Sequence, residues 1–148
     1  MVNDPHSAQP IDPARLHEKH RGTLTDLLGV RFVEGSRERI VAELTVRDEL
    51  LTTGGRLHGG TLMALADIVG ATGAAVNLPP ETWTTTLESK TNFFAGTGSG
   101  TIRAEATPVH RGKQTMVWQT RITDESGRLL SLTLQTQMVL QRRQSEQT

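Results

Sequence analysis

One long helix-forming segment, about residues 59–76, constrains the fold of this chain more than any other feature. It consists almost entirely of small and apolar residues, and Asn77, Pro79 and Pro80 stop it. Because it shows almost no polar face, we expect it to be buried on all sides. Glycine has low helix propensity, so several glycines within a helix indicate close packing against a sheet. The small residues that permit this approach are Gly70, Ala71, Gly73, Ala74 and Ala75.

Strand-forming stretches lie on both sides of this helix in the sequence, and two short helices are expected before the first strand. Strands grouped after a helix favour an α+β fold over the alternating pattern of a parallel sheet. The sequence therefore predicts one long central helix wrapped by a curved antiparallel sheet of about six strands. The predicted strands are residues 30–33 and 39–46 before the helix, and 83–95, 101–109, 114–123 and 128–140 after it.

The length and composition restrict the class of protein. A chain of 148 residues is expected to form one domain, residues 13–142, with a flexible leader at 1–12 and a tail at 143–148. The 16 basic and 16 acidic residues cancel, which argues against nucleic acid and membrane surfaces as partners. There is no cysteine, no signal peptide and no apolar run long enough to span a bilayer. We therefore expect a cytoplasmic protein that binds any anionic ligand through local cations.

Asp67 is the first candidate for chemistry. It lies about two turns inside the apolar helix, and no cation stands three or four residues away to pair with it. An arbitrary mid-helix aspartate usually faces solvent, but a carboxylate among small apolar residues can act as a general base or nucleophile. The N–H group of Gly59, at the start of the helix, suits a developing oxyanion.

The spacing of these residues resembles a known signature. His58-Gly59-Gly60, with an acid nine residues after the histidine, resembles hotdog-fold acyl-CoA thioesterases of the phenylacetate-pathway (PaaI-like) and 4-hydroxybenzoyl-CoA group. The resemblance covers about residues 25–140 and implies hydrolysis of a CoA thioester without metal or organic cofactor. It implies that the Gly59 N–H polarises the thioester carbonyl, and that Asp67 activates water or attacks directly. It gives His58 a structural role and Gly60 a role in close packing.

Further positions follow from the same resemblance. Thr52 stands where the family commonly has Asn or Gln, and Thr86 corresponds to a hydroxyl near the attacking water. The turn with Arg111 and Lys113 resembles the basic turn that meets coenzyme A phosphates, although a solvated turn has the same composition. Large side chains that could contact substrate, or could simply form core, are Met63, Trp83, Phe93, Phe94 and Trp118.

The oligomeric state follows from helix geometry as well as from the family. Gly59 and Asp67 are eight residues apart, so on one helix they stand about 12 Å apart along the axis. One thioester cannot contact both groups unless two antiparallel helices each supply one of them. We therefore expect a homodimer with two composite sites, and a dimer of dimers as the family assembly.

Two other functions remain open. A non-catalytic acyl-CoA-binding hotdog module would share these residues. A hotdog hydratase or dehydratase would need a His-Phe-Pro-Gly motif, which the sequence lacks, or an Asp-x-x-x-x-His motif, which occurs only at residues 12–17, far before the central helix. Ser99 does not lie in a Gly-x-Ser-x-Gly motif. His17 and His20 have the spacing of metal ligands on a helix, but no third ligand accompanies them. We expect them to be surface histidines.

Overall fold

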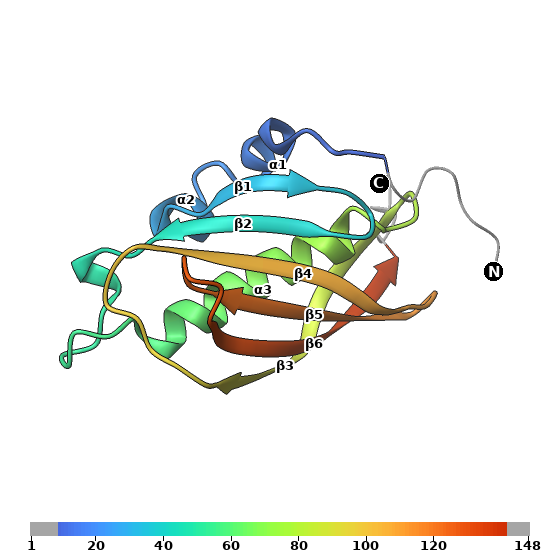
Figure 1. Ribbon diagram of the computed structural model, residues 1–148. Helices are drawn as coiled ribbons and strands as arrows, with labels where there is room; N and C mark the ends of the chain where they lie inside the picture. Colours follow the sequence, from blue (N-terminus) through green and yellow to red (C-terminus); the bar gives the residue numbers. More distant parts are fainter. Residues whose placement is uncertain (1–8, 142–148) are drawn as a thin grey trace, which may run out of the picture.

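The computed structural model describes residues 9–141, and it confirms the predicted α+β hotdog architecture. Six antiparallel strands form one curved sheet in the order β1-β2-β4-β5-β6-β3, and the long helix α3 lies along its inner side (Figure 1). β3 is therefore an edge strand. The helices are α1 (Pro13–His20), α2 (Leu24–Leu28), η1 (Asp48–Leu50) and α3 (Gly59–Ala75). The strands are β1 (Arg31–Gly35), β2 (Ile40–Thr45), β3 (Thr82–Phe93), β4 (Thr101–Arg111), β5 (Thr115–Thr123) and β6 (Leu129–Gln141).

The sheet covers only one side of α3, so the expected burial on all sides is wrong for the single chain. Leu62, Leu65 and Val69 are buried against the sheet. The opposite side of the helix remains half-exposed or exposed, because a single-layered sheet cannot enclose a helix completely. The residues of this open apolar stripe are Ala64, Ile68, Ala71 and Ala75.

The N-terminal helix α1 is attached to the domain by both of its histidines. His17 Nε2 accepts a hydrogen bond from the Phe32 N–H of β1 at 3.1 Å. His20 Nε2 lies 3.1 Å from Thr72 Oγ1 of α3, and its Nδ1 lies 3.0 Å from Thr25 Oγ1 of α2. The expectation of surface histidines is therefore wrong: both rings are half-buried contacts between elements that are distant in sequence.

The predicted leader and tail lie largely outside the described residues, because the structure describes neither 1–8 nor 142–148. Asp12 accepts a hydrogen bond from the Ala14 N–H and caps α1. Within residues 9–141, no helix is long and apolar enough to cross a membrane.

Candidate active site

The start of α3 leaves one amide available. His58 is the N-cap: its Nδ1 accepts from the Gly60 N–H at 2.8 Å. The Thr61 and Leu62 N–H groups donate to the His58 carbonyl at 2.9 and 3.3 Å. Within the described part of the chain, no hydrogen-bond acceptor reaches the Gly59 N–H. Gly59 therefore presents the one unsatisfied donor among the first amides of the helix.

The surroundings of this amide include the ring of Phe93. A β-carbon at Gly59 would lie 3.3 Å from two Phe93 ring carbons, so glycine gives the ring its place over the helix start. Met63 is exposed one turn further along α3. Thr52 lies in the loop before the helix, where its carbonyl accepts from the Gly55 N–H and its N–H donates to the Arg56 carbonyl. These residues occupy the N-terminal end of α3.

A second group of residues surrounds Asp67, two turns further along α3. Thr86 Oγ1 of β3 donates to Asp67 Oδ1 at 2.9 Å, so two predicted site residues are in direct contact. The network also contains two side chains that the sequence analysis missed. Gln135 Nε2 of β6 donates to Asp67 Oδ1 at 3.1 Å, and Gln137 Nε2 donates to Thr86 Oγ1 at 2.7 Å. The Thr86 proton is therefore directed at the carboxylate rather than at a water molecule.

Asp67 borders a pocket between α1 and α3. Its volume is about 330 Å³, and most of its wall is apolar. Thr84 of β3 and the hydrogen-bonded pair His20 and Thr72 contribute polar groups. The apolar wall consists of Leu16, Ile68, Ala71, Ala75 and Val76.

The large side chains named from the sequence do not line this pocket. Trp118 is fully buried in the core, and Phe93 and Met63 lie near the start of α3. Trp83 and Phe94 are exposed on β3 and just after it. Because aromatic side chains are large, size alone favoured them as residues that contact substrate. The pocket wall contains Ala71 and Ala75 instead, and these small side chains leave room for the pocket.

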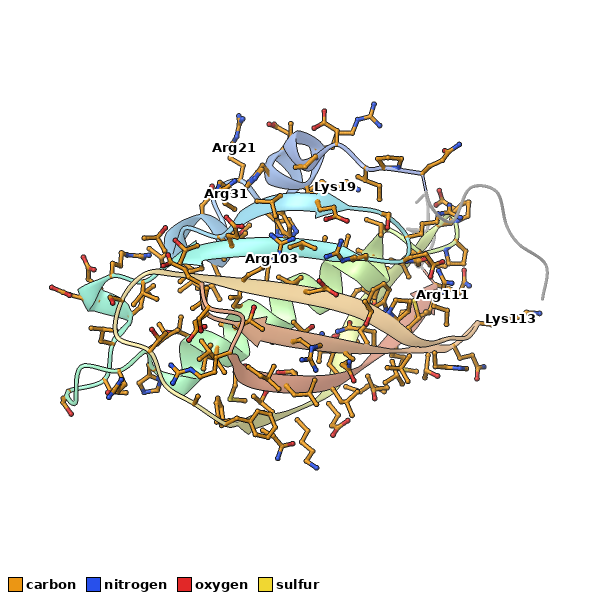
Figure 2. The ribbon with its side chains drawn as sticks, viewed as in Figure 1. Lys19, Arg21, Arg31, Arg103, Arg111 and Lys113 are labelled. Carbon is orange, nitrogen blue, oxygen red and sulfur yellow. The ribbon has the colours of Figure 1, made fainter. Side chains whose placement is uncertain are left out.

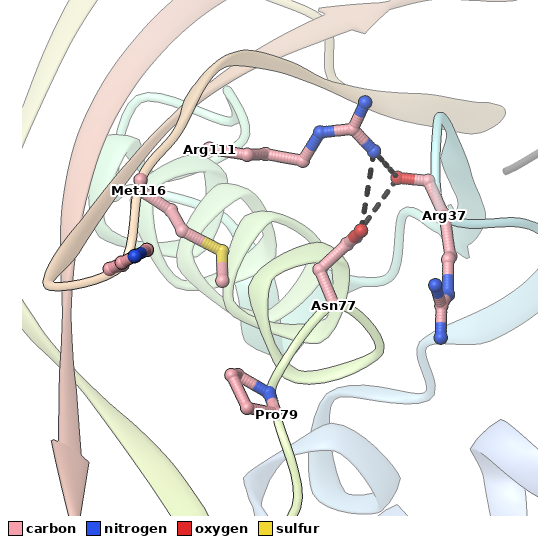
Figure 3. A pocket seen from close by; sticks show the side chains of 7 residues that line it. Arg37, Asn77, Pro79, Arg111 and Met116 are labelled. Atoms are coloured by element: carbon pink, nitrogen blue, oxygen red, sulfur yellow. Dashed lines mark hydrogen bonds between the residues drawn. The ribbon is translucent and has the colours of Figure 1, made fainter. Parts of the chain in front are cut away.

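The predicted basic turn forms part of a separate pocket of about 380 Å³ beyond the C-terminal end of α3. Arg111 and Lys113 lie at the turn between β4 and β5, with Lys113 near its tip (Figure 2). Arg111 Nη2 pairs with Glu38 Oε1 at 2.7 Å. Figure 3 shows that Arg111 Nη1 also donates to Asn77 Oδ1, at 3.3 Å. Arg37, which the sequence analysis did not select, also lines this pocket.

The predicted site residues thus form three groups along α3 of one chain. Thr52, His58, Gly59 and Phe93 mark its start, Asp67 with Thr86 its middle, and the Arg111 pocket lies beyond its end. Gly59 and Asp67 belong to one regular helix, which keeps the separation of about 12 Å expected from their spacing. Among residues 9–141, no three acidic or histidine side chains gather in a way that could hold a metal ion.

Comparison with known proteins agrees with this geometry. The sequence matches the Thioesterase superfamily over residues 54–131, which include the start of α3, Asp67 and Arg111. A 1,4-dihydroxy-2-naphthoyl-CoA hydrolase from Listeria monocytogenes is 33% identical over 109 residues, covering 74% of this chain and 89% of the relative.

Solved structures share the architecture. A variant of the thioesterase PA1618 from Pseudomonas aeruginosa is 27% identical, with a TM-score of 0.86, and the match covers 92% of this chain and 99% of the other. The PaaI protein from the phenylacetic acid degradation operon of Escherichia coli, 21% identical, has the same fold, with a TM-score of 0.78 over 86% of this chain and 91% of the other. The chain belongs to the thioesterase superfamily and is a thioester hydrolase.

Proposed function

We propose that this enzyme hydrolyses an acyl-CoA thioester to the free acid and coenzyme A, in the cytoplasm, with Asp67 as the reacting carboxylate. The observation that carries the proposal is the position of Asp67. Its Oδ1 accepts two hydrogen bonds, and the residue borders a largely apolar pocket. These two donors hold one carboxylate oxygen in place, and a carboxylate so placed can act as base or nucleophile.

Asp67 can promote hydrolysis of the thioester by either of two routes. As a base, Asp67 takes a proton from water, the water oxygen bonds to the thioester carbon, the carbon–sulfur bond breaks, and the leaving thiolate takes the proton. As a nucleophile, the carboxylate displaces the thiolate and forms an anhydride, which water then hydrolyses. In both routes negative charge develops on the thioester oxygen, and an N–H donor at that point lowers the barrier.

The unsatisfied Gly59 N–H suits this oxyanion, but the donor must come from a second copy. The separation of about 12 Å along α3 keeps the Gly59 and Asp67 of one chain from acting on one carbonyl. The open apolar stripe of α3 supports a dimer in which the two helices face each other in antiparallel directions. Thr52 then lies near the partner's site rather than its own. A dimer of dimers is the complete assembly that we expect.

The two pockets suit the two ends of the substrate. The Asp67 pocket, about 330 Å³, shares Ile68, Ala71 and Ala75 with the open apolar stripe, so a compact hydrophobic acyl group bound there lies beside the partner helix. The naphthoyl-CoA hydrolase among the relatives supports an aromatic acyl group. The pocket with Arg37, Arg111 and Lys113 suits the phosphates of coenzyme A. Met63, Phe93 and Gly60 are proposed to contact the pantetheine arm near the start of the helix.

The test is thiol release from a panel of aryl, short-chain and long-chain acyl-CoAs. We expect aryl thioesters to be hydrolysed fastest, and Asp67→Asn to lose about 10²–10⁴-fold in kcat while keeping its fold and its affinity for acyl-CoA. Asp12→Asn is the matched control, because asparagine also caps a helix and residue 12 lies outside the site. Binding of acyl-CoA without thiol release by the folded wild type would make the protein a binding module. Full activity of Asp67→Asn would remove Asp67 from the reaction.

A further inference from the structure

Gln135 is a fully buried amide whose side chain reaches α3 at Asp67. Its Nε2 donates to Asp67 Oδ1 at 3.1 Å and to the Asp67 backbone carbonyl at 3.4 Å. The reverse amide orientation would set Oε1 against these same two acceptors, so hydrogen-bonding chemistry requires Nε2 on this side. The amide therefore serves Asp67 as a donor.

The helix is shaped to admit this amide. A β-carbon at Gly70 would lie 2.3 Å from Gln135 Oε1 and 2.7 Å from the amide carbon, closer than any real contact. Gly70 is the residue three positions after Asp67 on α3, where the amide passes. The glycine lowers helix propensity by about 1 kcal/mol relative to alanine. The space that the Gln135 side chain needs beside the helix explains why a residue of low helix propensity stands at position 70.

A second buried glutamine controls the other donor to Asp67. Gln137 Nε2 donates to Thr86 Oγ1 at 2.7 Å, and the Thr84 hydroxyl lies 3.1 Å from both Gln137 Oε1 and the Met138 carbonyl oxygen. A hydroxyl carries one proton, and Thr86 directs it at Asp67 Oδ1. Two donors from two strands thus meet on Oδ1, and within residues 9–141 no hydrogen bond reaches Oδ2.

We infer that Gln135 is a positioning residue for Asp67, assisted by Gln137 through Thr86. The Gln135 amide and the Thr86 hydroxyl hold Oδ1 and leave Oδ2 as the oxygen that takes the proton of water or attacks the thioester. The inference rests on the proposed role of Asp67. It adds two residues of β6, a strand that contacts the catalytic helix, on which the orientation of the reacting carboxylate depends.

The burial of Gln135 argues against a purely structural role. Its Oε1 is buried with no hydrogen-bond partner among the described residues. A buried polar atom without a partner destabilises a fold, whereas an apolar side chain of similar shape does not. The Gln135 amide therefore orients the Asp67 carboxylate, although its unpaired oxygen lowers the stability of the fold.

The variant Gln135→Met separates an effect on activity from an effect on stability. Methionine has nearly the same shape but no amide, so we expect kcat to fall by about 10- to 100-fold, with KM nearly unchanged and the melting temperature equal to or above that of the wild type. The split between kcat and KM distinguishes a positioning role from a role in substrate binding.

Three variants complete the experiment. Thr133→Val removes a buried hydroxyl from the same face of β6, where it contacts Thr91 and not Asp67, and should leave kcat unchanged. Gln137→Met should also lower kcat with KM nearly unchanged, and it tests the same network through Thr86. Asp67→Asn is measured in parallel and tests the proposed function separately.

The outcomes are distinct. Wild-type kcat in a folded Gln135→Met or Gln137→Met protein overturns the inference, provided that Asp67→Asn is inactive. Loss of activity together with loss of stability in Gln135→Met also overturns it, because the amide would then serve the fold. If Asp67→Asn remains active, the proposed role of Asp67 fails, and the inference fails with it.

Discussion

The ring of Trp118 lies directly against Gly73 of α3: a β-carbon at residue 73 would come within 2.5 Å of the ring. Trp118 is fully buried on β5, so the ring has no free space into which to move. The absence of a side chain at Gly73 therefore sets the distance between the helix and the sheet.

The first prediction concerns this contact. Gly73→Ala should destabilise the protein by about 1–3 kcal/mol, because overpacking outweighs the gain of about 1 kcal/mol in helix propensity. The free energy of unfolding in urea measures the effect. In a Trp118→Leu background, the same substitution should cost less, since the ring is gone. Equal stability of Gly73→Ala and the wild type would contradict the close packing.

The second prediction concerns the hydrogen-bonded pair His20 and Thr72. Burial lowers the pKa of His20 below its usual 6.5, with further lowering by His17 and Lys19 and an opposing effect of Asp26. The unfolded chain therefore binds a proton more readily than the folded one, so stability is complete above pH 6.5 and is lost as the pH falls below it.

Unfolding of the wild type and of His20→Gln at pH 7.5 and pH 5.5 measures this dependence. Glutamine can donate to Thr72 but does not titrate, so the variant should lose less stability than the wild type between the two pH values. An identical loss in both proteins would mean that His20 is not the group responsible.

The third prediction concerns the composite site. Asp67→Ala and Gly59→Pro should each be inactive, since the first lacks the carboxylate and the second lacks the N–H. Proline is favourable at the first position of a helix, and the exposed Phe93 ring has room to shift by a few tenths of an ångström.

Refolding the two variants together should restore about a quarter of wild-type activity. Random pairing makes about half of the dimers mixed, and each mixed dimer contains one intact site and one doubly defective site. The proportion of mixed dimers is checked by mass spectrometry with a tag on one variant. Mixed dimers without activity would locate the whole site within one chain.

The fourth prediction concerns the cations beyond the end of α3. Replacing both Arg111 and Lys113 with alanine should raise KM for acyl-CoA by about tenfold and leave kcat nearly unchanged, because a phosphate contact is made equally in the ground and transition states. A truncated thioester without the nucleotide should be hydrolysed equally by the variant and the wild type.

Arg103→Ala is the matched control for these cations. Arg103 also pairs with a carboxylate, Glu43, but it lies outside the pocket that contains Arg111. Its replacement should leave KM unchanged. Equal losses on full-length and truncated substrates in the double variant would show that the basic turn acts on folding rather than on binding.

Local chemistry made much of the fold predictable. Small residues at Gly70 and Gly73 indicated a helix packed against a sheet, and both glycines do face large side chains of the sheet. Asp67 could be predicted as a site residue because a carboxylate in an apolar helix destabilises the fold unless it has a function. Thr86 could be predicted from its place in a motif that resembles the family's. The helix and all six strands were predicted to within a few residues of their observed ends.

The two glutamines could not be predicted in the same way. Gln135 and Gln137 are 68 and 51 residues away in sequence from the groups they contact, and their alignment depends on a bulge in β3 between Thr86 and Glu88. Alternation in β6 suggests that its leucines face the core, yet Thr133, Gln135 and Gln137 are buried and Leu134 is exposed. Strand register and bulges are set by the whole sheet, so one sequence does not show which face of β6 meets Asp67.

The position of β3 at the edge of the sheet has a consequence for how assembly can be observed. In an antiparallel edge strand, alternate amides point away from the only neighbouring strand, here β6. In a lone chain these amides exchange their hydrogens with water freely, whereas pairing with another strand protects them. Some alternate amides of Thr82–Phe93 would then exchange their hydrogens more slowly as the protein concentration rises. These amides would identify, residue by residue, where two chains pair.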